Sequence, residues 1–212
     1  MNLLILLRMK FKVCGLKESA NMLDVSELKP DYIGLIFWSK SKRFVKYSTP
    51  ELPNEIKKTG VFVDENSAEI KNKIKEHSLK AIQLHGKESP SFCKNLMSSK
   101  IEVIKSFSVD NEFDFSIVNE YKDSCNLFLF DTKSDLPGGS GISFDWEILK
   151  KYNLEKPFFI SGGIGIDSTK KILDLLTNNL PIHGIDVNSK FENEDTLKDI
   201  GKLKEFKKIL RL

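Results

Sequence analysis

Eight short apolar segments recur along the chain at fairly even spacing, with longer amphipathic stretches between them. Each segment has the length of a buried strand, and its apolar residues run continuously instead of alternating with polar ones. This pattern is typical of parallel strands that are covered on both faces. The segments are Phe11–Cys14, Tyr32–Phe37, Gly60–Val63, Ala81–Leu84, Ile101–Phe107, Leu127–Phe130, Pro157–Ile160 and Gly184–Val187.

Helical periodicity occurs in the stretches between these segments. The predicted apolar stripes are Ile70, Ile74 and His77; Ile172, Leu173, Leu175 and Leu176; and Ile200, Leu203, Phe206, Ile209 and Leu210. The last stripe lies in the basic segment Asp199–Leu212. For this segment a helix packed on the sheet is favoured over a helix lying on a membrane surface.

Eight strands alternating with about eight helices indicate repeated βα units, for which two architectures compete. One is a closed (β/α)8 TIM barrel and the other is an open, doubly wound sheet. The number of strands favours the barrel, although 212 residues is near the lower limit for that fold. No linker, composition shift or low-complexity block interrupts the pattern, so we expect a single barrel domain at 10–212.

The N-terminal segment 1–9 is expected to lie outside this domain. Met1–Leu7 is mostly apolar, and Arg8, Met9 and Lys10 follow it. The segment lacks the basic start and cleavage site of a signal peptide, and it is far shorter than the ~20 residues that span a membrane. We therefore expect a short extension that is not native, with translation starting at Met9, which the intact mass of the native protein would test.

Composition excludes several classes of protein. Hydrophobic residues make up 40% of the chain and charged residues 30%, which rules out a disordered or collagen-like chain. The net charge of +3 argues against a nucleic-acid partner and is compatible with a small anionic substrate. Three cysteines are too few for a disulfide framework, so a reduced, cytoplasmic protein is expected.

Active sites of βα barrels form at the carboxyl ends of the strands, which makes the first strand end important. Cys14 ends the first strand, where it could be a thiolate base or nucleophile, or a small buried apolar residue. A free thiol has a pKa of about 8.5, so Cys14 would need local help to act as a thiolate near neutral pH. Cys93 and Cys125 have no such position and are interpreted as packing residues.

The second and fourth strands also lead into polar residues. Arg43 lies in the long loop after the second strand, and its guanidinium suits the capture of a carboxylate or phosphate. Lys40 and Lys42 of the same loop are interpreted as solvated charges. Gln83 and His85 lie at the end of the fourth strand. His85 could be an acid, a base or a hydrogen-bond donor, although an isolated histidine is more often structural.

The sixth strand ends in Asp131. A carboxyl group at the mouth of an apolar strand could be a general acid, or it could cap the next turn. The glycine-rich segment that follows, which includes Gly141, could approach an anion or form a flexible lid. It matches neither a P-loop nor a dinucleotide-binding fingerprint, since Phe144 occupies the third glycine position.

The seventh and eighth strands end in small and polar residues. Gly162 and Gly163 follow the seventh strand, and Asp186, Asn188 and Ser189 end the eighth. Phosphate sites of barrels are often built from the loops after these two strands, so a phosphate site is expected here. No cluster of His, Cys or Asp has metal-ligand spacing, so no metal is expected.

Taken together, these segments resemble the phosphoribosylanthranilate isomerase family of tryptophan biosynthesis over residues 10 to about 210. The matching segments, in family order, are Lys12–Leu16, Gly34–Phe37, Ser39–Arg43, Gly60–Val63, Gln83–Gly86, Phe130–Thr132, Gly138–Gly141, Phe144–Trp146, Ser161–Ile164 and Gly184–Val187. Each segment is a weak signal alone, and the ordered set is specific. The resemblance implies a (β/α)8 barrel without cofactor or metal.

The resemblance also implies a reaction and the roles of residues. The reaction is the Amadori rearrangement of N-(5-phosphoribosyl)anthranilate to 1-(2-carboxyphenylamino)-1-deoxyribulose 5-phosphate. Asp131 matches the general acid that opens the furanose ring, and Cys14 matches the general base that takes the proton from sugar C2. Arg43 matches the residue that holds the anthranilate carboxylate. The residues that match the phosphate-binding region or other substrate-binding positions are Gln83, His85, Gly141, Gly162, Gly163, Asp186, Asn188 and Ser189.

One departure from the family pattern lies in the last loop, where Lys190 replaces a glycine. A backbone that needed a positive φ would resist this change. Two other functions stay open: a different phosphosugar barrel enzyme, and a non-catalytic barrel that binds a phosphoribosyl ligand. The expected partner is a small anionic phosphosugar, with no nucleic acid or membrane, and we expect a monomer rather than a homodimer.

Overall fold

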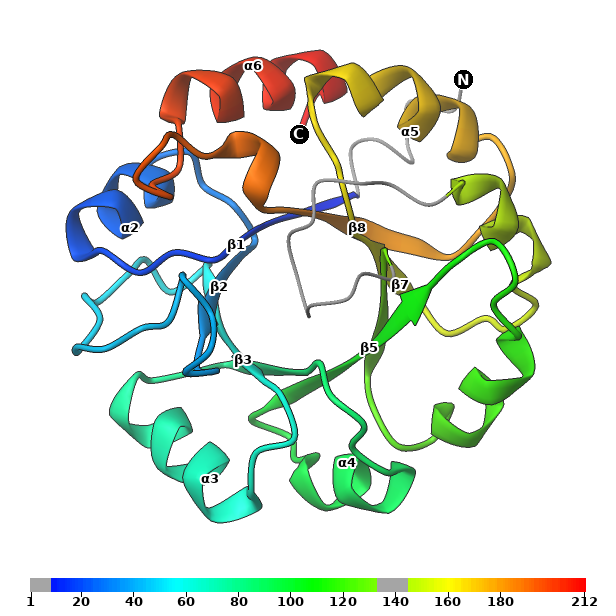
Figure 1. Cartoon of the computed structure of the whole chain (residues 1–212), viewed down its shortest axis with the longest axis horizontal. Coiled ribbons are helices and arrows are strands. Elements are labelled where there is room, and N and C mark those ends of the chain that lie inside the picture. Colours follow the sequence, from blue (N-terminus) through cyan, green and yellow to red (C-terminus); the bar gives the residue numbers. More distant parts are fainter. Residues whose placement is uncertain (1–8, 133–144) are drawn as a thin grey trace.

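The computed structural model describes residues 9–132 and 145–212, and its strands close into a barrel (Figure 1). Every strand pairs in parallel with the next, and β8 pairs with β1 to close the sheet. The strands are β1 (Lys10–Cys14), β2 (Tyr32–Ile36), β3 (Lys57–Phe62), β4 (Ala81–Leu84), β5 (Glu102–Val109), β6 (Leu127–Thr132), β7 (Phe158–Ile160) and β8 (Ile182–Val187). The predicted single-domain (β/α)8 barrel is confirmed, and every predicted strand is present with ends shifted by a few residues.

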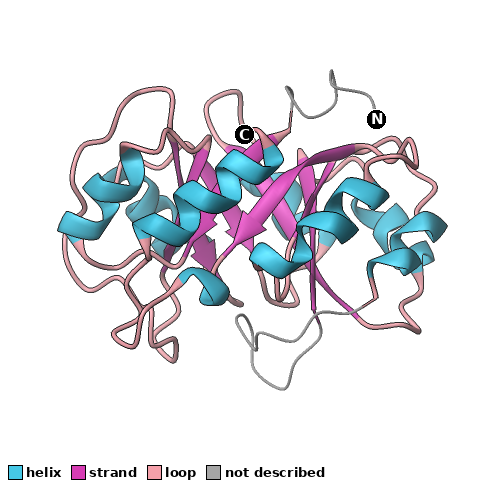
Figure 2. Ribbon diagram, turned by 90° about the horizontal axis from the view of Figure 1, so that it is seen from above, coloured by secondary structure: helices cyan, strands magenta, loops and turns pink. Residues whose placement is uncertain are grey.

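Helices surround the barrel, as the side view shows (Figure 2). The α-helices are α2 (Ser19–Ser26), α3 (Ser67–Glu76), α4 (Pro90–Leu96), α5 (Thr169–Leu175) and α6 (Ile200–Leu210). Short 3₁₀ helices are η1 (Phe115–Tyr121), η2 (Trp146–Lys151), η3 (Ile166–Ser168) and η4 (Ser189–Phe191). In the part of the chain that the structure describes, no helix is long and apolar enough to cross a membrane.

Among the connections that the structure describes in full, the expectation of about eight helices is wrong in two. The connection from β2 to β3 contains no helix, because it carries Pro50 and Pro53 and lacks an apolar stripe. After β5, only the 3₁₀ helix η1 follows, and Asp114 caps it by accepting a hydrogen bond from the Ser116 backbone. The closed sheet therefore tolerates connections that are less regular than complete α-helices.

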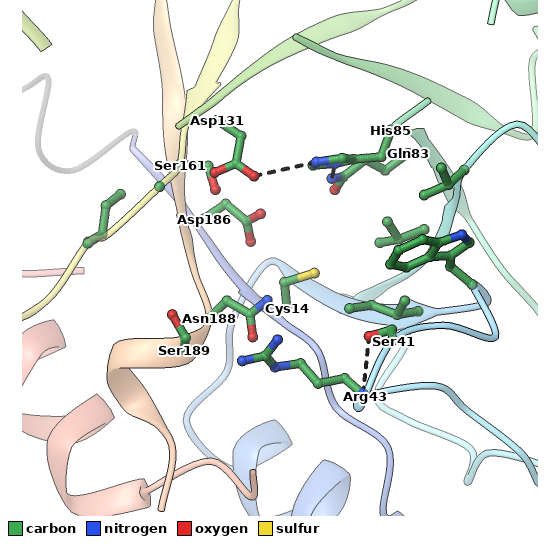
Figure 3. A pocket seen from close by; sticks show the side chains of 16 residues that line it. Cys14, Ser41, Arg43, Gln83, His85, Asp131, Ser161, Asp186, Asn188 and Ser189 are labelled. Carbon is green, nitrogen blue, oxygen red and sulfur yellow. Dashed lines mark hydrogen bonds and ion pairs between the residues drawn. The ribbon is translucent and has the colours of Figure 1, made fainter. Parts of the chain in front are cut away.

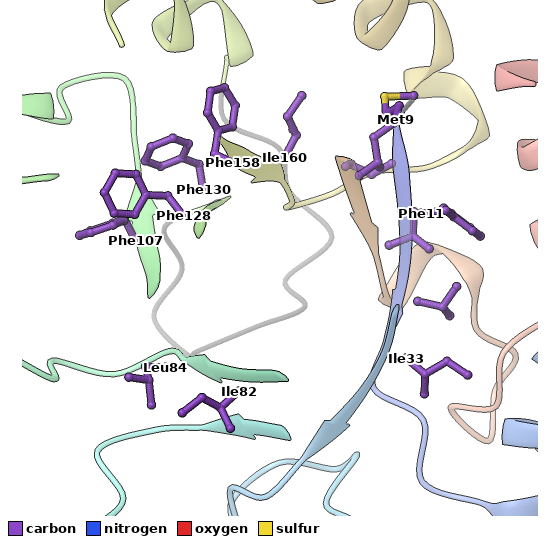
Figure 4. Close-up of a cluster of buried hydrophobic side chains, with 14 of the residues drawn as sticks. Met9, Phe11, Ile33, Ile82, Leu84, Phe107, Phe128, Phe130, Phe158 and Ile160 are labelled. Carbon is purple, nitrogen blue, oxygen red and sulfur yellow. The ribbon is translucent and has the colours of Figure 1, made fainter. Parts of the chain in front are cut away.

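The strands alternate between two apolar layers, and β6 shows the alternation clearly. Leu127 and Leu129 belong to the small cluster inside the barrel, whereas Phe128 and Phe130 belong to the large cluster between the sheet and the helices (Figure 4). Because side chains of a strand alternate in direction, Asp131 continues the inward row of Leu127 and Leu129. The apolar strand thus aims a carboxyl group at the mouth of the barrel.

Helix α6 packs against the sheet, as its predicted stripe indicates. Its buried side chains are Leu203, Phe206 and Leu210, spaced at three and four residues, and Asp199 caps its start by accepting from the Lys202 backbone. The assignment of Ile209 to the buried stripe is wrong, because this side chain is 42% exposed. Ile209 lies one residue before Leu210 and so points about 100° away from the packed face.

Candidate active site

A pocket opens at the carboxyl ends of the strands, where polar side chains from five strands meet (Figure 3). Its lining includes the last residue of β1, residues within β4, β6 and β8, and residues that directly follow β4, β7 and β8. The lining residues are Cys14, Ile36, Trp38, Ser41, Arg43, Val61, Val63, Gln83, His85, Asp131, Ser161, Gly162, Ile164, Asp186, Asn188 and Ser189. This is the end of the barrel where the sequence places the site.

Of the predicted site residues, nine line this pocket, one does not, and one lies outside the described residues. Those that line it are Cys14, Arg43, Gln83, His85, Asp131, Gly162, Asp186, Asn188 and Ser189. Gly163 follows Gly162 in the chain but is not part of the lining. Gly141 lies outside the described residues. The pocket also includes Ser41 and Ser161, which belong to the recognised motifs but were not predicted as site residues.

Cys14 is a buried, free thiol at the end of β1. Burial raises the pKa of the Cys14 thiol, and the positive charge of Lys12 opposes this effect. Lys12 therefore lowers the pKa of the Cys14 thiol, as a thiolate near neutral pH would require, but burial has the larger effect and the pKa is raised overall. Cys93 and Cys125 are also free and buried, and burial raises their pKa values to about 11 and about 12. Neither lines the pocket, in accord with their interpretation as packing residues.

Gly34 of β2 leaves the space that the Cys14 thiol occupies. The two residues are register partners, and a Cβ atom at Gly34 would lie 2.5 Å from Cys14 Sγ and 2.9 Å from its Cα. These distances are shorter than any ordinary van der Waals contact. The Cys14 Cα belongs to the backbone, which cannot easily move away. The position of the thiol therefore depends on a glycine in the neighbouring strand.

We expect Gly34→Ala to displace the thiol and to lower kcat by about 10- to 100-fold, since small errors in position are costly in catalysis. Steady-state kinetics with phosphoribosylanthranilate, the substrate that the sequence resemblance implies, measures the effect. Gly201→Ala is the matched control, because a Cβ at Gly201 meets only the Asp199 side chain, at 3.2 Å. Wild-type kcat in Gly34→Ala would show that the reaction does not depend on the thiol position.

A chain of contacts links Asp131 to β4. Asp131 Oδ2 lies 3.4 Å from His85 Nε2, and His85 Nδ1 lies 2.8 Å from Gln83 Nε2. If the Gln83 amide donates to Nδ1, the His85 proton sits on Nε2 and faces the Asp131 carboxyl. Asp131 also accepts a hydrogen bond of 3.0 Å from the Thr132 backbone. The two roles considered for Asp131, general acid and cap of the next turn, both stay open. The side chain accepts a hydrogen bond from the following backbone, and it also lines the pocket.

Asp186 and Lys12 form an ion pair inside the barrel. The residues are register partners on β8 and β1, and Lys12 Nζ lies 2.9 Å from Asp186 Oδ1. Burial raises the pKa of Asp186, and the Lys12 ammonium opposes it. Burial also lowers the pKa of Lys12, but Asp186 and Cys14 together outweigh that effect and leave the pKa raised. Lys12 is thus held in its charged form. It precedes Cys14 by two residues in β1, so the two side chains lie on the same inner face of the strand.

Arg43 is paired with Glu192 in the structure. Its Nε and one terminal nitrogen donate to the two Glu192 oxygens at 2.6 and 2.7 Å. Arginine has five N–H donors, so the outer edge of the guanidinium stays available to a ligand. Glu192 holds this group in a fixed orientation, and Figure 3 shows Arg43 beside Asn188 and Cys14.

Lys198 completes the charged cluster behind Arg43. Its Nζ donates to Glu192 Oε1 at 2.5 Å and to Asn188 Oδ1 at 2.7 Å. Burial lowers the pKa of Lys198 to about 8, with Glu192 opposing. Burial raises the pKa of Glu192, but the hydrogen bond from Arg43 and the charge of Lys198 leave it lowered. This cluster orients two pocket residues, Arg43 and Asn188.

The sequence interpretation missed Lys12, Glu192 and Lys198 as parts of the site. Lys12 could have been found, because a charged residue stands in the middle of an apolar strand and must be paired if it is buried. Glu192 belongs to the last-loop pattern, but the partner of its carboxylate comes from a loop 149 residues earlier. Lys198 carries no local signal of its own.

The backbone after β7 suits an anion. Gly162 and Gly163 have φ values of +87° and +62°, which L-residues with side chains rarely adopt. A Cβ atom at Gly162 would also lie 2.1 Å from Thr132 Oγ1, so a side chain is excluded there. Lys190 lies in η4 with no positive φ, so its replacement of a glycine brings no backbone strain. Among the described residues, no cluster of three His, Cys, Asp or Glu side chains could hold a metal ion.

Comparison with known proteins gives one consistent match. The model of the N-(5'-phosphoribosyl)anthranilate (PRA) isomerase family matches residues 11–208. A protein named N-(5'-phosphoribosyl)anthranilate isomerase from Parabacteroides distasonis is 40% identical over 204 residues, which cover 93% of this chain and 91% of that protein.

Solved structures agree with this match in fold. The crystal structure of phosphoribosyl anthranilate isomerase from Thermotoga maritima has a TM-score of 0.81 and 30% identity, covering 96% of this chain and 98% of that one. A structure of the enzyme in complex with reduced 1-(o-carboxyphenylamino)-1-deoxyribulose 5-phosphate has a TM-score of 0.78 and 27% identity, with the same coverage.

Proposed function

The chain belongs to the N-(5'-phosphoribosyl)anthranilate isomerase family, and from this membership we propose how its pocket divides the reaction between an acid and a base. The activity is the isomerisation of N-(5-phosphoribosyl)anthranilate, a step of tryptophan biosynthesis. One observation carries the assignment of roles: a carboxyl group from β6 and a thiol from β1 line the same pocket. These groups differ in acidity, as a proton donor and a proton acceptor must.

Asp131 is the general acid for ring opening. Its proton passes to the furanose ring oxygen while the bond between that oxygen and C1 breaks, and the anthranilate nitrogen stabilises the resulting iminium. His85, 3.4 Å from the Asp131 carboxyl, orients that group toward the pocket. A carboxyl at this depth acts without competition from bulk water, since Asp131 is only 7% exposed.

Cys14 is the general base for the second step. Its thiolate takes the proton from C2 of the opened sugar, and the electrons of the C2–H bond move toward the iminium to give an enolamine. Ketonisation then removes the enol O–H proton and adds a proton to C1, so the whole rearrangement consumes none. The reaction needs no external oxidant or reductant, because C1 is reduced while C2 of the same molecule is oxidised.

The substrate carries a carboxylate and a phosphate, and the pocket offers a place for each. Arg43 binds the anthranilate carboxylate with the donors that Glu192 leaves available. The turn at Gly162 and Gly163, together with Asn188 and Ser189, binds the phosphate. Asp186 faces the sugar. The relative solved with the reduced deoxyribulose phosphate binds a compound with the same two anionic groups, which supports this arrangement.

Turnover of phosphoribosylanthranilate by the purified chain tests the proposed function. We expect loss of substrate and formation of the deoxyribulose product without added metal or cofactor. A chain that binds the reduced product analogue without turning over substrate would instead be a binding protein.

We expect Arg43→Lys to raise KM by about 10- to 100-fold with a smaller change in kcat. Lysine keeps the charge but loses the paired donors, and a hydrogen bond to a charged group contributes about 1.5–3 kcal/mol. An interaction made equally in the ground and transition states appears in KM. Lys42→Met, which changes an exposed charge next to Arg43, is the control and should keep KM. An unchanged KM in Arg43→Lys would exclude this residue from carboxylate binding.

We propose a monomer in the cytoplasm as the working form. Large apolar side chains exposed in the described chain are Leu23, Tyr47, Ile117 and Ile209, which come from different elements and do not suggest an obligate interface. A reduced compartment suits the free Cys14 thiol. Sedimentation equilibrium measures the oligomeric state directly.

A further inference from the structure

Lys12 is the most deeply buried charge beside the pocket, and the proposed mechanism gives it no step. Its side chain has no exposed surface, and it is not part of the pocket lining. It precedes Cys14 by two residues on β1, so both side chains point to the inside of the barrel. Lys12 therefore shares the inner face of β1 with the thiol but lies outside the pocket lining.

The Lys12 ammonium is close to Asp186 but is not satisfied by a hydrogen bond. Asp186 Oδ1 lies 2.9 Å from Nζ, but neither atom makes a hydrogen bond of ordinary geometry. Burying an ammonium group with unsatisfied donors costs folding free energy. A second group that the Lys12 charge stabilises would offset part of this cost. Among the described residues, the other ionisable group that acts on Lys12 is the Cys14 thiol.

We propose that Lys12 is a positioning residue that keeps Cys14 usable as a base, with its buried charge stabilising the thiolate while Asp186 holds the ammonium in place. This inference rests on the proposed role of Cys14. A thiolate in an apolar barrel would otherwise be disfavoured by burial alone. The proton that Cys14 takes from C2 forms an S–H bond, while Lys12 stays protonated and paired with Asp186.

Several other charged groups face the same space. Asp186 of β8 raises the pKa of the Cys14 thiol, and Lys198, before α6, lowers it less than Lys12 does. Asp131 of β6 and His85, directly after β4, act on Asp186. Lys12 is the strongest influence that opposes burial, so its removal should have the largest effect on the thiol.

Titration of the Cys14 thiol in Lys12→Met tests the inference. Thiolate absorbance near 240 nm is followed against pH, and the same titration with Cys14→Ser added is subtracted so that only Cys14 is measured. We expect the Cys14 pKa to rise by about one pH unit or more, which is about tenfold less thiolate at a given pH below the pKa. The kcat near neutral pH should fall by about tenfold, with little change in KM, and should recover as pH rises.

Three variants separate this role from a structural one. Lys12→Arg keeps the charge and should keep the thiol pKa near the wild-type value. Lys105→Met removes another buried ion pair, 2.8 Å from Glu88, and should leave the thiol pKa unchanged. Lys12→Met with Asp186→Asn leaves no buried carboxylate unpaired, so it serves if the single variant does not fold. It should still raise the thiol pKa, because Lys12 acts on Cys14 more strongly than Asp186 does.

An unchanged thiol pKa in Lys12→Met, or in the double variant, would overturn the inference even if kcat fell. The proposed function fails by a different result, namely full turnover in Cys14→Ser. The titration reports on Lys12 in either case, so the two failures are distinguishable.

Discussion

Replacement of Cys14 by serine is expected to lower kcat by about 10²–10⁴-fold, the usual contribution of a general base. Serine keeps the shape of the side chain, but its hydroxyl is far too weak an acid to supply an anion in this buried place. Since the loss concerns the transition state, kcat and kcat/KM should fall together. Steady-state kinetics with phosphoribosylanthranilate measures both.

Cys93→Ser is the matched control for this prediction. Cys93 is a buried free thiol in α4, outside the pocket, so its replacement should leave kcat near the wild-type value once folding is verified by circular dichroism. Full turnover in Cys14→Ser would remove Cys14 from the mechanism. Equal losses in the two variants would point to a general effect of replacing a buried thiol.

The second large effect is expected for Asp131→Asn, with kcat reduced by about 10²–10⁴-fold. Asparagine fills the same volume and can still meet His85 and the Thr132 backbone, but it has no carboxyl proton to give to the ring oxygen. Because ring opening precedes proton abstraction, the variant should be unable to form the open iminium, whatever the state of Cys14. Binding of the reduced product analogue should survive, which calorimetry measures.

Asp24→Asn, an exposed change on α2, is the control and should keep wild-type kinetics. Wild-type kcat in Asp131→Asn would exclude Asp131 as the acid. Loss of analogue binding together with activity would mean that the residue holds the substrate instead of protonating it.

The framework of the barrel could be predicted because its signals are local. Each strand is a continuous apolar run, and the strand ends identify Cys14, Asp131 and Asp186 by position alone, since parallel strands in a barrel end at one face. The alternation along β6 carries Asp131 inward with Leu127 and Leu129. No long-range information is needed for these conclusions.

The charged network behind the pocket could not be predicted in the same way. Arg43, from the loop after β2, meets Glu192, from the segment after β8, and Lys198 joins them from the segment before α6. Such pairs depend on the closure of the sheet and leave no periodic signal in the sequence. For the same reason, the sequence identifies Arg43 as a candidate anion-binding residue but does not reveal its partner Glu192.

Growth of a host that lacks this isomerase and requires tryptophan tests the central claim most directly. The claim predicts that the wild-type chain restores growth without tryptophan, whereas the Cys14→Ser/Asp131→Asn double variant, expressed to the same level, does not. Growth restored equally by the double variant, or no growth with the wild-type chain, would contradict it.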